Sequence, residues 1–137
     1  MEFNIRNLIE KDYETLKVWW ENWRGWGTAP PKDFLPGNGT SGFIVEKDNI
    51  GVVAGFLYTT NSKAAILEWV ISNPEYKNKD RKEALELLIK GAENVANSSG
   101  YRYMFTITGN QHLINTHEKL GWTKDPRKSH ELTKKLY

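Results

Sequence analysis

The pattern of apolar and polar positions divides the chain into strand-like and helix-like segments. Short alternating or continuous apolar runs predict strands at residues 3–7, 43–45, 50–58, 64–71, 101–108 and 129–136. Apolar residues at three- and four-residue spacing predict helices at 12–23, 80–99 and 110–120. The stretch 25–42 is rich in glycine and proline, which predicts a long loop with a short helical turn near residues 32–35.

The order of these elements predicts a mixed α/β sheet. The three strands that follow the loop are joined by short turns, so we expect them to form an antiparallel meander. The strands before and after the 80–99 helix must run parallel, because a crossover helix returns the chain in the same direction. We therefore expect an α+β mixed sheet with one parallel β-α-β crossover, helices on both faces, and a single domain over residues 1–137.

Turn and cap residues support these boundaries. Lys47-Asp48-Asn49 is typical of a tight hairpin turn. Asp12 is expected to cap the first helix, and Asp80-Arg-Lys-Glu83 has the pattern of a capping box at the start of the second. Asn110 and Gly121 are expected to open and close the third helix.

Composition limits the classes of function. A chain of 137 residues with 39% hydrophobic and 26% charged residues is typical of one globular domain, and its net charge of +2 argues against a polyanionic partner. Cysteine is absent, which excludes thiolate nucleophiles and cysteine-based zinc sites, and the three histidines lack metal-ligand spacing. No signal peptide or membrane span is apparent. We expect a cytoplasmic protein with no metal, nucleic-acid or membrane partner.

His117 lies on the apolar face of the third predicted helix. Leu113, Ile114, His117 and Leu120 fall at helical spacing, so the imidazole points to the same side as the apolar residues. A lone histidine in that position is most simply a core residue with a satisfied ring. A polar ring just after the end of a strand is also where a site can form.

Glu68 is a carboxylate on a strand predicted to be central. Alternation places Glu68, Val70 and Ser72 on one face and Trp69 and Ile71 on the other. An unpaired charge is costly there, so Glu68 either forms an ion pair or takes part in chemistry.

Basic residues gather at the start of the second predicted helix. Lys77, Lys79, Arg81 and Lys82 place four positive charges within six residues. This is either a solvated helix start or an anion site, and the helix macrodipole makes positive charge unfavourable there unless an anion binds. The pattern therefore favours an anion site.

Six tryptophans are too many to face one core. Trp26 lies in the glycine- and proline-rich loop, between Gly25 and Gly27, and is expected at the mouth of a cleft. An aromatic wall in this region suits an apolar or cationic ligand.

The segment Asn110, Leu113-Ile114, His117-Glu118-Lys-Leu120-Gly121-Trp122 resembles the terminal motif of the GNAT superfamily of N-acetyltransferases, and the element order resembles that family over nearly the whole chain. The resemblance implies acetyl-CoA as co-substrate and direct attack by an amine, with no covalent enzyme intermediate. It leaves open a small-molecule or a protein amine as acceptor, and a monomer or a homodimer.

The resemblance also implies roles for single residues. Glu68 matches a general base, and His117 stands where a tyrosine commonly protonates the departing thiolate. Val70, Ile71 and Ser72 would pair with the pantetheine arm, Asn110 would line the opposite wall near the thioester, and Trp26 and Trp69 would shape the acceptor pocket. The loop expected to hold the pyrophosphate departs from the family, because Asn78, Asp80 and Lys82 stand where small residues belong. The cofactor contacts would then come from the segment Lys77, Asn78, Lys79, Asp80, Arg81 and Lys82.

A second interpretation follows from that departure. A GNAT-like fold without catalysis could bind a protein or ligand through its tryptophan-rich loop. A DNA- or RNA-binding role is a distant third, since the net charge is low.

Overall fold

The structure is a computed structural model that describes residues 2–23 and 27–137, and it divides into two compact units, residues 1–106 and 107–137. The first unit holds five strands, two α-helices and two short 3-10 helices, in the order β1 (Asn4–Asn7), α1 (Asp12–Asn22), η1 (Lys32–Phe34), η2 (Pro36–Gly39), β2 (Gly42–Lys47), β3 (Ile50–Tyr58), β4 (Ala64–Ser72), α2 (Arg81–Ser98) and β5 (Tyr103–Phe105). The second unit holds helix α3 (Gln111–Lys119).

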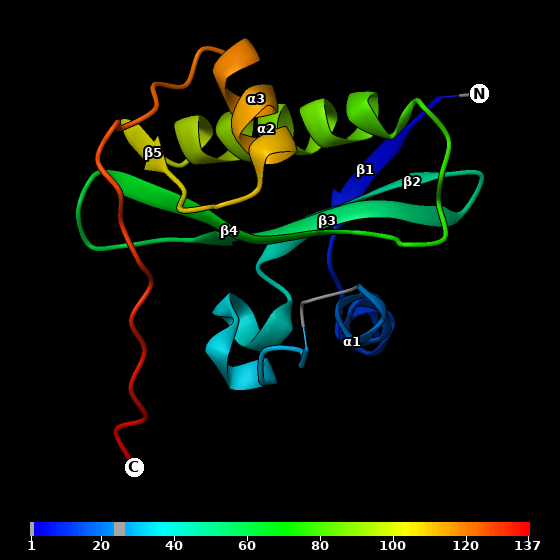
Figure 1. The fold of residues 1–137 in the computed structure, drawn as a ribbon, viewed down its shortest axis with the longest axis horizontal. Coiled ribbons are helices and arrows are strands. Elements are labelled where there is room, and N and C mark those ends of the chain that lie inside the picture. Colours follow the sequence, from blue (N-terminus) through cyan, green and yellow to red (C-terminus); the bar gives the residue numbers. More distant parts are fainter. Residues whose placement is uncertain (1, 24–26) are drawn as a thin grey trace. The chain divides into compact units, whose positions relative to one another are not determined.

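The first unit is a five-stranded mixed sheet in the order β1-β2-β3-β4-β5. The first four strands pair antiparallel, and β5 pairs parallel to β4 after the crossover through α2. Helices α1 and α2 lie on opposite faces of the sheet (Figure 1). The expected mixed sheet with a single parallel crossover and helices on both faces is confirmed. Within residues 2–23 and 27–137, no helix combines the length and apolar character that crossing a membrane requires.

The β2–β3 hairpin forms at the predicted turn. Asp48 and Asn49 adopt φ values of 54° and 66°. Left-handed conformations at both central residues match the right-handed twist of the flanking strands, and aspartate and asparagine tolerate them well. Strand β2 of this hairpin ends at Lys47, whose side chain bonds Asp80 at the end of the loop between β4 and α2.

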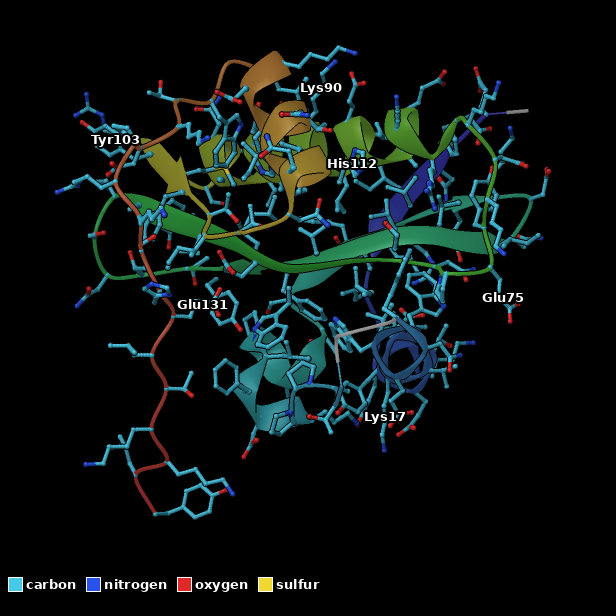
Figure 2. All side chains as sticks on the ribbon, viewed as in Figure 1. Lys17, Glu75, Lys90, Tyr103, His112 and Glu131 are labelled. Atoms are coloured by element: carbon cyan, nitrogen blue, oxygen red, sulfur yellow. The ribbon has the colours of Figure 1, made fainter. Side chains whose placement is uncertain are left out.

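Two hydrophobic layers cover the two faces of the sheet. On the α1 face, Trp20 stacks on Phe56 with ring centroids 6.2 Å apart, and both side chains are fully buried. On the other face, Leu88 and neighbouring apolar residues of α2 are buried. Polar residues such as Lys17 lie on the side of α1 away from the sheet (Figure 2).

Asp12 does not cap helix α1, contrary to prediction. The helix begins at Asp12 without a side-chain cap, and the carboxylate instead binds Arg6 of β1 through two hydrogen bonds of 2.8 and 3.0 Å. It also accepts the backbone N–H of Ile9 at 2.7 Å. Because Arg6 bonds Glu46 of β2 as well, this buried carboxylate joins the helix to two strands.

The C-terminal region differs from the prediction. Strand β5 covers Tyr103–Phe105 rather than residues 101–108, and the expected strand at 129–136 does not form. Leu132 and Leu136 are more than nine-tenths exposed. A strand requires a hydrogen-bonding neighbour, and two isolated leucines among polar residues give little apolar surface to hold one in place.

The Arg6–Asp12 pair makes stability depend on pH. Burial raises the pKa of Asp12, but hydrogen bonds from Arg6 and from the Ile9 amide lower it, and the resulting pKa lies below its ordinary value. The pair therefore stabilises the fold above the unfolded-state pKa of about 4, and this stabilisation is lost as the pH falls through the folded-state pKa. We expect Asp12→Asn to lose about 2 kcal/mol at pH 7 and progressively less as the pH falls from 4 through the folded-state pKa, measured by urea unfolding. A loss that does not decrease as the pH falls would contradict this assignment.

Candidate functional site

A β-bulge interrupts strand β4 at Trp69. The register passes from Phe56↔Glu68 to Ala54↔Ile71, so two residues of β4 face the single residue Gly55 of β3. Trp69 takes a φ of 56°, in the left-handed region that a bulky residue seldom adopts.

The bulge changes which side chains share a face. Cross-strand partners lie on the same face, so Glu68 and Ile71 both point to the α1 side. Val70 instead lies on the α2 side, because a Cβ placed on Gly55 would meet Val70 and Leu88 at 3.2 Å each. The strict alternation expected along this strand, with Glu68 and Val70 together, is therefore wrong. The extra residue in the bulge reverses the alternation beyond it.

The parallel pairing of β4 with β5 is short. It runs from Ala64↔Tyr103 to Ile66↔Phe105, whereas β4 continues to Ser72. Val70, Ile71 and Ser72 therefore lie beyond the end of the parallel ladder. One acceptor at the end of the strand is already used, since the indole N–H of Trp23 donates to the Ser72 carbonyl at 2.6 Å.

Glu68 is held in a polar setting within an otherwise aromatic region. The Thr106 hydroxyl donates to its Oε1 at 3.0 Å. The pKa of Tyr58 is raised above its ordinary value, mainly by burial. A hydrogen bond with Trp69 lowers this pKa and the nearby Glu68 charge raises it further, so the phenol stays protonated. Its hydroxyl donates to the Phe34 carbonyl at 3.0 Å. These bonds keep the carboxylate and the neighbouring rings in fixed positions.

Aromatic rings from three elements meet next to Glu68. Trp69 packs edge-on against Trp20 of α1 at 6.1 Å and against Phe34 of η1 at 5.7 Å. Phe34 remains 48% exposed, so this cluster reaches the surface. Trp26, the other residue expected in the acceptor pocket, lies outside the described residues.

The loop between β4 and α2 is fixed at its start and exposed in its middle. Asn73 donates to the Gly51 carbonyl at 2.9 Å through its side chain, and its backbone N–H donates to Val52 at 2.9 Å. Figure 2 shows Glu75 further along the loop. Beyond it the exposed residues are mostly basic: Lys77, Asn78 and Lys79 in the loop, then Arg81 and Lys82 in the first turn of α2. None of the four cations forms an ion pair with any residue that the structure describes.

Asp80 does not form the expected capping box. It occupies the position before α2, but its side chain makes no cap hydrogen bond. One carboxylate oxygen accepts from Lys47 Nζ at 2.6 Å and the other from the Tyr76 hydroxyl at 2.9 Å. The capping prediction is wrong because a lysine distant in sequence competes successfully for the carboxylate. The hydrogen bond from Lys47 holds the pKa of Asp80 below its ordinary value.

Helix α3 in the second unit has the predicted ends. The Asn110 side chain accepts the Leu113 N–H at 3.0 Å. At the other end Gly121 takes a φ of 96°, and the N–H groups of Gly121 and Trp122 bond the carbonyls of Glu118 and His117. This is a Schellman motif, which needs glycine at that position. The side chain of Asn110 thus has a structural role in its own helix.

His117 is buried, as its helical spacing predicts. Its Nδ1 lies 2.8 Å from the Leu113 carbonyl, and its ring packs edge-on against Trp122 at 4.5 Å. A carbonyl can only accept, so Nδ1 carries the hydrogen. In the neutral ring Nε2 then has no proton to give, and a donor role at Nε2 requires the imidazolium.

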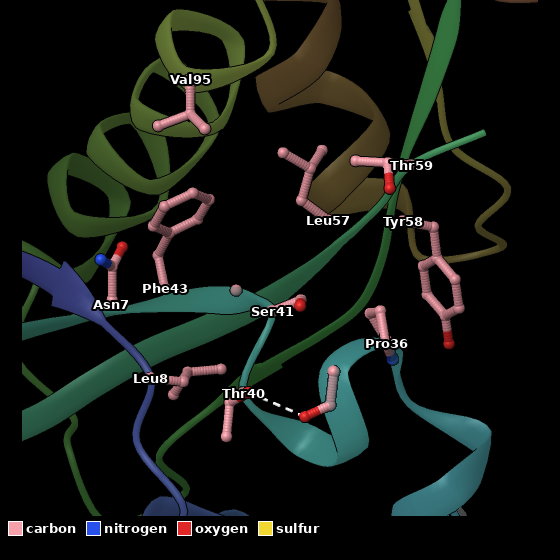
Figure 3. Close-up of a pocket in the computed structure, with 12 residues that line it drawn as sticks. Asn7, Leu8, Pro36, Thr40, Ser41, Phe43, Leu57, Tyr58, Thr59 and Val95 are labelled. Atoms are coloured by element: carbon pink, nitrogen blue, oxygen red, sulfur yellow. Dashed lines mark hydrogen bonds between the residues drawn. The ribbon is translucent and has the colours of Figure 1, made fainter. Parts of the chain in front are cut away.

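A separate hollow of about 500 Å³ lies where η2, β2 and β3 meet, and Val95 of α2 also lines it (Figure 3). Its lining includes Phe43, Leu57 and the hydroxyl-bearing Thr40, with no acidic or basic side chain. It therefore offers no charge to a phosphate. No group of three or more potential metal ligands occurs within the described ranges.

Three residues near the predicted site were not anticipated from sequence. Tyr58 ends an apolar strand and reads as a core position, and Thr106 lies in a segment whose pairing was expected to be longer. Lys47 was assigned only to a turn. Each of these side chains contributes to the site through a hydrogen bond to a residue at least ten positions away, so no local sequence pattern indicates its role.

Solved structures show which fold this is. The chain matches the aminoglycoside N-acetyltransferase AAC(6')-Iy, solved with a CoA-containing bisubstrate analogue, at 16% identity and a TM-score of 0.68, with 98% of this chain and 99% of that chain covered. It matches the ribosomal-protein-S18-alanine N-acetyltransferase of Escherichia coli at 18% and 0.65, covering 88% and 77%. A transcriptional regulator of Bacillus halodurans matches at 15% and 0.66, covering 99% and 100%. No family model and no curated protein matches the sequence.

The chain therefore has the fold of the GNAT N-acetyltransferases, as the sequence resemblance indicated. The identities are low, and the third match is described as a regulator. The fold alone consequently does not decide between catalysis and binding.

The hydrogen bond of His117 determines its tautomer. We expect long-range ¹⁵N–¹H spectra above pH 8 to show the proton of His117 on Nδ1 and a bare Nε2. The exposed His112 and His130 serve as internal references for rings without such a carbonyl. A proton on Nε2 of His117 would show that the Leu113 contact does not form in solution.

Proposed function

We propose that the protein is an acetyl-CoA-dependent N-acetyltransferase that acts by direct attack of an amine. The observation that carries this proposal is the end of the parallel ladder at Ile66, beside the bulge at Trp69. Strand β4 then continues past this point into a loop that carries Lys77 and Lys79, and Arg81 and Lys82 follow in the first turn of α2. Within the described residues none of these four cations forms an ion pair. A strand edge and a cationic loop in succession suit a ligand with an amide-bearing arm and phosphates at its end.

The described residues fit such a ligand. Backbone groups of Val70, Ile71 and Ser72 would pair with the pantetheine arm, and Lys77, Lys79, Arg81 and Lys82 would face the phosphates, with Asn78 between them. Charge-assisted contacts of this kind are stronger than neutral ones, which would compensate for the lack of small residues at Asn78, Asp80 and Lys82. When bound, acetyl-CoA supplies an acetyl group activated as a thioester.

Glu68 is the proposed general base. An amine enters as an ammonium ion and must lose a proton before its lone pair can attack, and the Glu68 carboxylate would accept that proton directly or through water. Thr106 would keep the carboxylate oriented. The rings of Trp69 and Phe34 would hold an acceptor that carries its amine next to an apolar or aromatic body, because cations bind favourably to aromatic faces.

His117 is the proposed donor to the leaving thiolate. Since its Nδ1 hydrogen is engaged by Leu113, the proton would come from Nε2 of the imidazolium. A tyrosine phenol in this place would offer its proton in the neutral form, whereas the imidazole of His117 offers one on Nε2 only as the imidazolium.

Binding of acetyl-CoA is the first test. We expect a thermal-shift titration with acetyl-CoA or CoA to raise the melting temperature in a saturable way. At about 100 times Kd the stabilisation should approach ~2.7 kcal/mol. Pantetheine, which lacks the nucleotide phosphates, should shift it less. A flat response to all three would refute the proposal and favour a binding module of the same fold.

Replacement of Glu68 tests catalysis apart from binding. With a panel of small primary amines and peptide N-termini as acceptors, we expect Glu68→Gln to lower kcat/KM for the acceptor by roughly 10²–10⁴. Binding of acetyl-CoA should not change. Glu14→Gln, an exposed change on α1, is the matched control. Turnover is measured from the CoA thiol that the reaction releases. Full turnover in Glu68→Gln would exclude Glu68 as the base.

A further inference from the structure

The loop proposed to bind phosphate contains one acidic side chain whose position is unusual. Asp80 is the residue just before α2, within a segment where Lys77, Lys79, Arg81 and Lys82 are exposed. An unpaired carboxylate there would repel a polyphosphate. Both of its oxygens are instead engaged, by Lys47 and by Tyr76.

Lys47 reaches this loop from a different part of the fold. It is the last residue of β2, and its ammonium group also lies over the Phe3 ring at 5.3 Å from the centroid. The side chains of Lys47 and Asp80 are 22% and 24% exposed, so the pair is mostly screened from solvent. The ammonium group is thus held by the sheet and not by the loop that it contacts.

The same hairpin holds both ends of the loop. At the start, Asn73 bonds Gly51 and Val52 of β3. At the end, Asp80 bonds Lys47 of β2. Lys77 and Lys79 lie between these two attachment points, and Arg81 and Lys82 follow directly after the second one, in the first turn of α2.

We propose that Lys47 is a positioning residue for this anion site: it neutralises Asp80 and fixes the end of the loop, so that the Asp80 carboxylate does not repel a diphosphate that binds to the neighbouring cations. This inference rests on the proposed function. It explains how a loop with aspartate in place of a small residue still accepts phosphates.

Isothermal titration with CoA tests this role without relying on turnover. In low salt we expect Lys47→Met to weaken CoA binding roughly tenfold, because it leaves the Asp80 charge uncompensated. Lys47→Arg should bind as the unmodified protein does. Adding Asp80→Asn to Lys47→Met should restore binding, since both charges are then absent. Pantetheine affinity should stay the same in all variants, because it has no phosphates to repel.

Lys32→Met is the control. This substitution also breaks an ion pair with a carboxylate, that of Glu10, but at a position away from this loop in sequence. It should leave CoA binding unchanged. Unaltered CoA affinity in Lys47→Met would overturn the inference. So would a double variant that stays as weak as Lys47→Met, which would mean that Lys47 contacts the phosphates itself or only supports the fold. Absence of CoA binding in the unmodified protein would instead refute the proposed function.

Discussion

The central constraint on this molecule is the incomplete pairing of strand β4. One edge of the strand follows β3 along its length, while the other edge pairs with β5 only as far as Ile66. Glu68, paired with Phe56, faces the aromatic α1 side just before the bulge at Trp69, and the bulge turns Val70 to the opposite side. Strand β4 thus carries, one after another along the chain, the Glu68 carboxylate, the backbone groups of residues 70–72 and the start of the cationic loop.

Much of the fold follows from short-range patterns. Asn110 and Gly121 predict both ends of α3 correctly, because a side-chain cap and a left-handed glycine act within one helix turn. The hairpin at Asp48-Asn49 forms for a similar local reason. Element order then gives the parallel crossover, since connection handedness and length leave few alternatives.

The errors arise where distant residues compete for a local feature. Asp12 and Asp80 both look like helix caps, but each binds a cation from a strand, Arg6 or Lys47, that no spacing rule connects to it. The bulge at Trp69 lies opposite Gly55 of the neighbouring strand, where a side chain would crowd Val70 and Leu88. The last expected strand, at residues 129–136, does not form, because two leucines among polar residues give little apolar surface to hold it against a sheet. The roles of the site residues likewise depend on spatial neighbours, which the sequence does not display.

The most direct test of this account is amide hydrogen exchange with and without acetyl-CoA. If the pantetheine arm pairs with the free edge of β4, the amides of residues 70–72 should exchange more slowly in the presence of the ligand, by a factor that rises with its concentration. Those of residues 77–82 should also gain protection, while β3 at residues 52–56 should not change. Protection confined to the loop, or none in β4, would contradict the claim that the incomplete strand pairing forms the binding site.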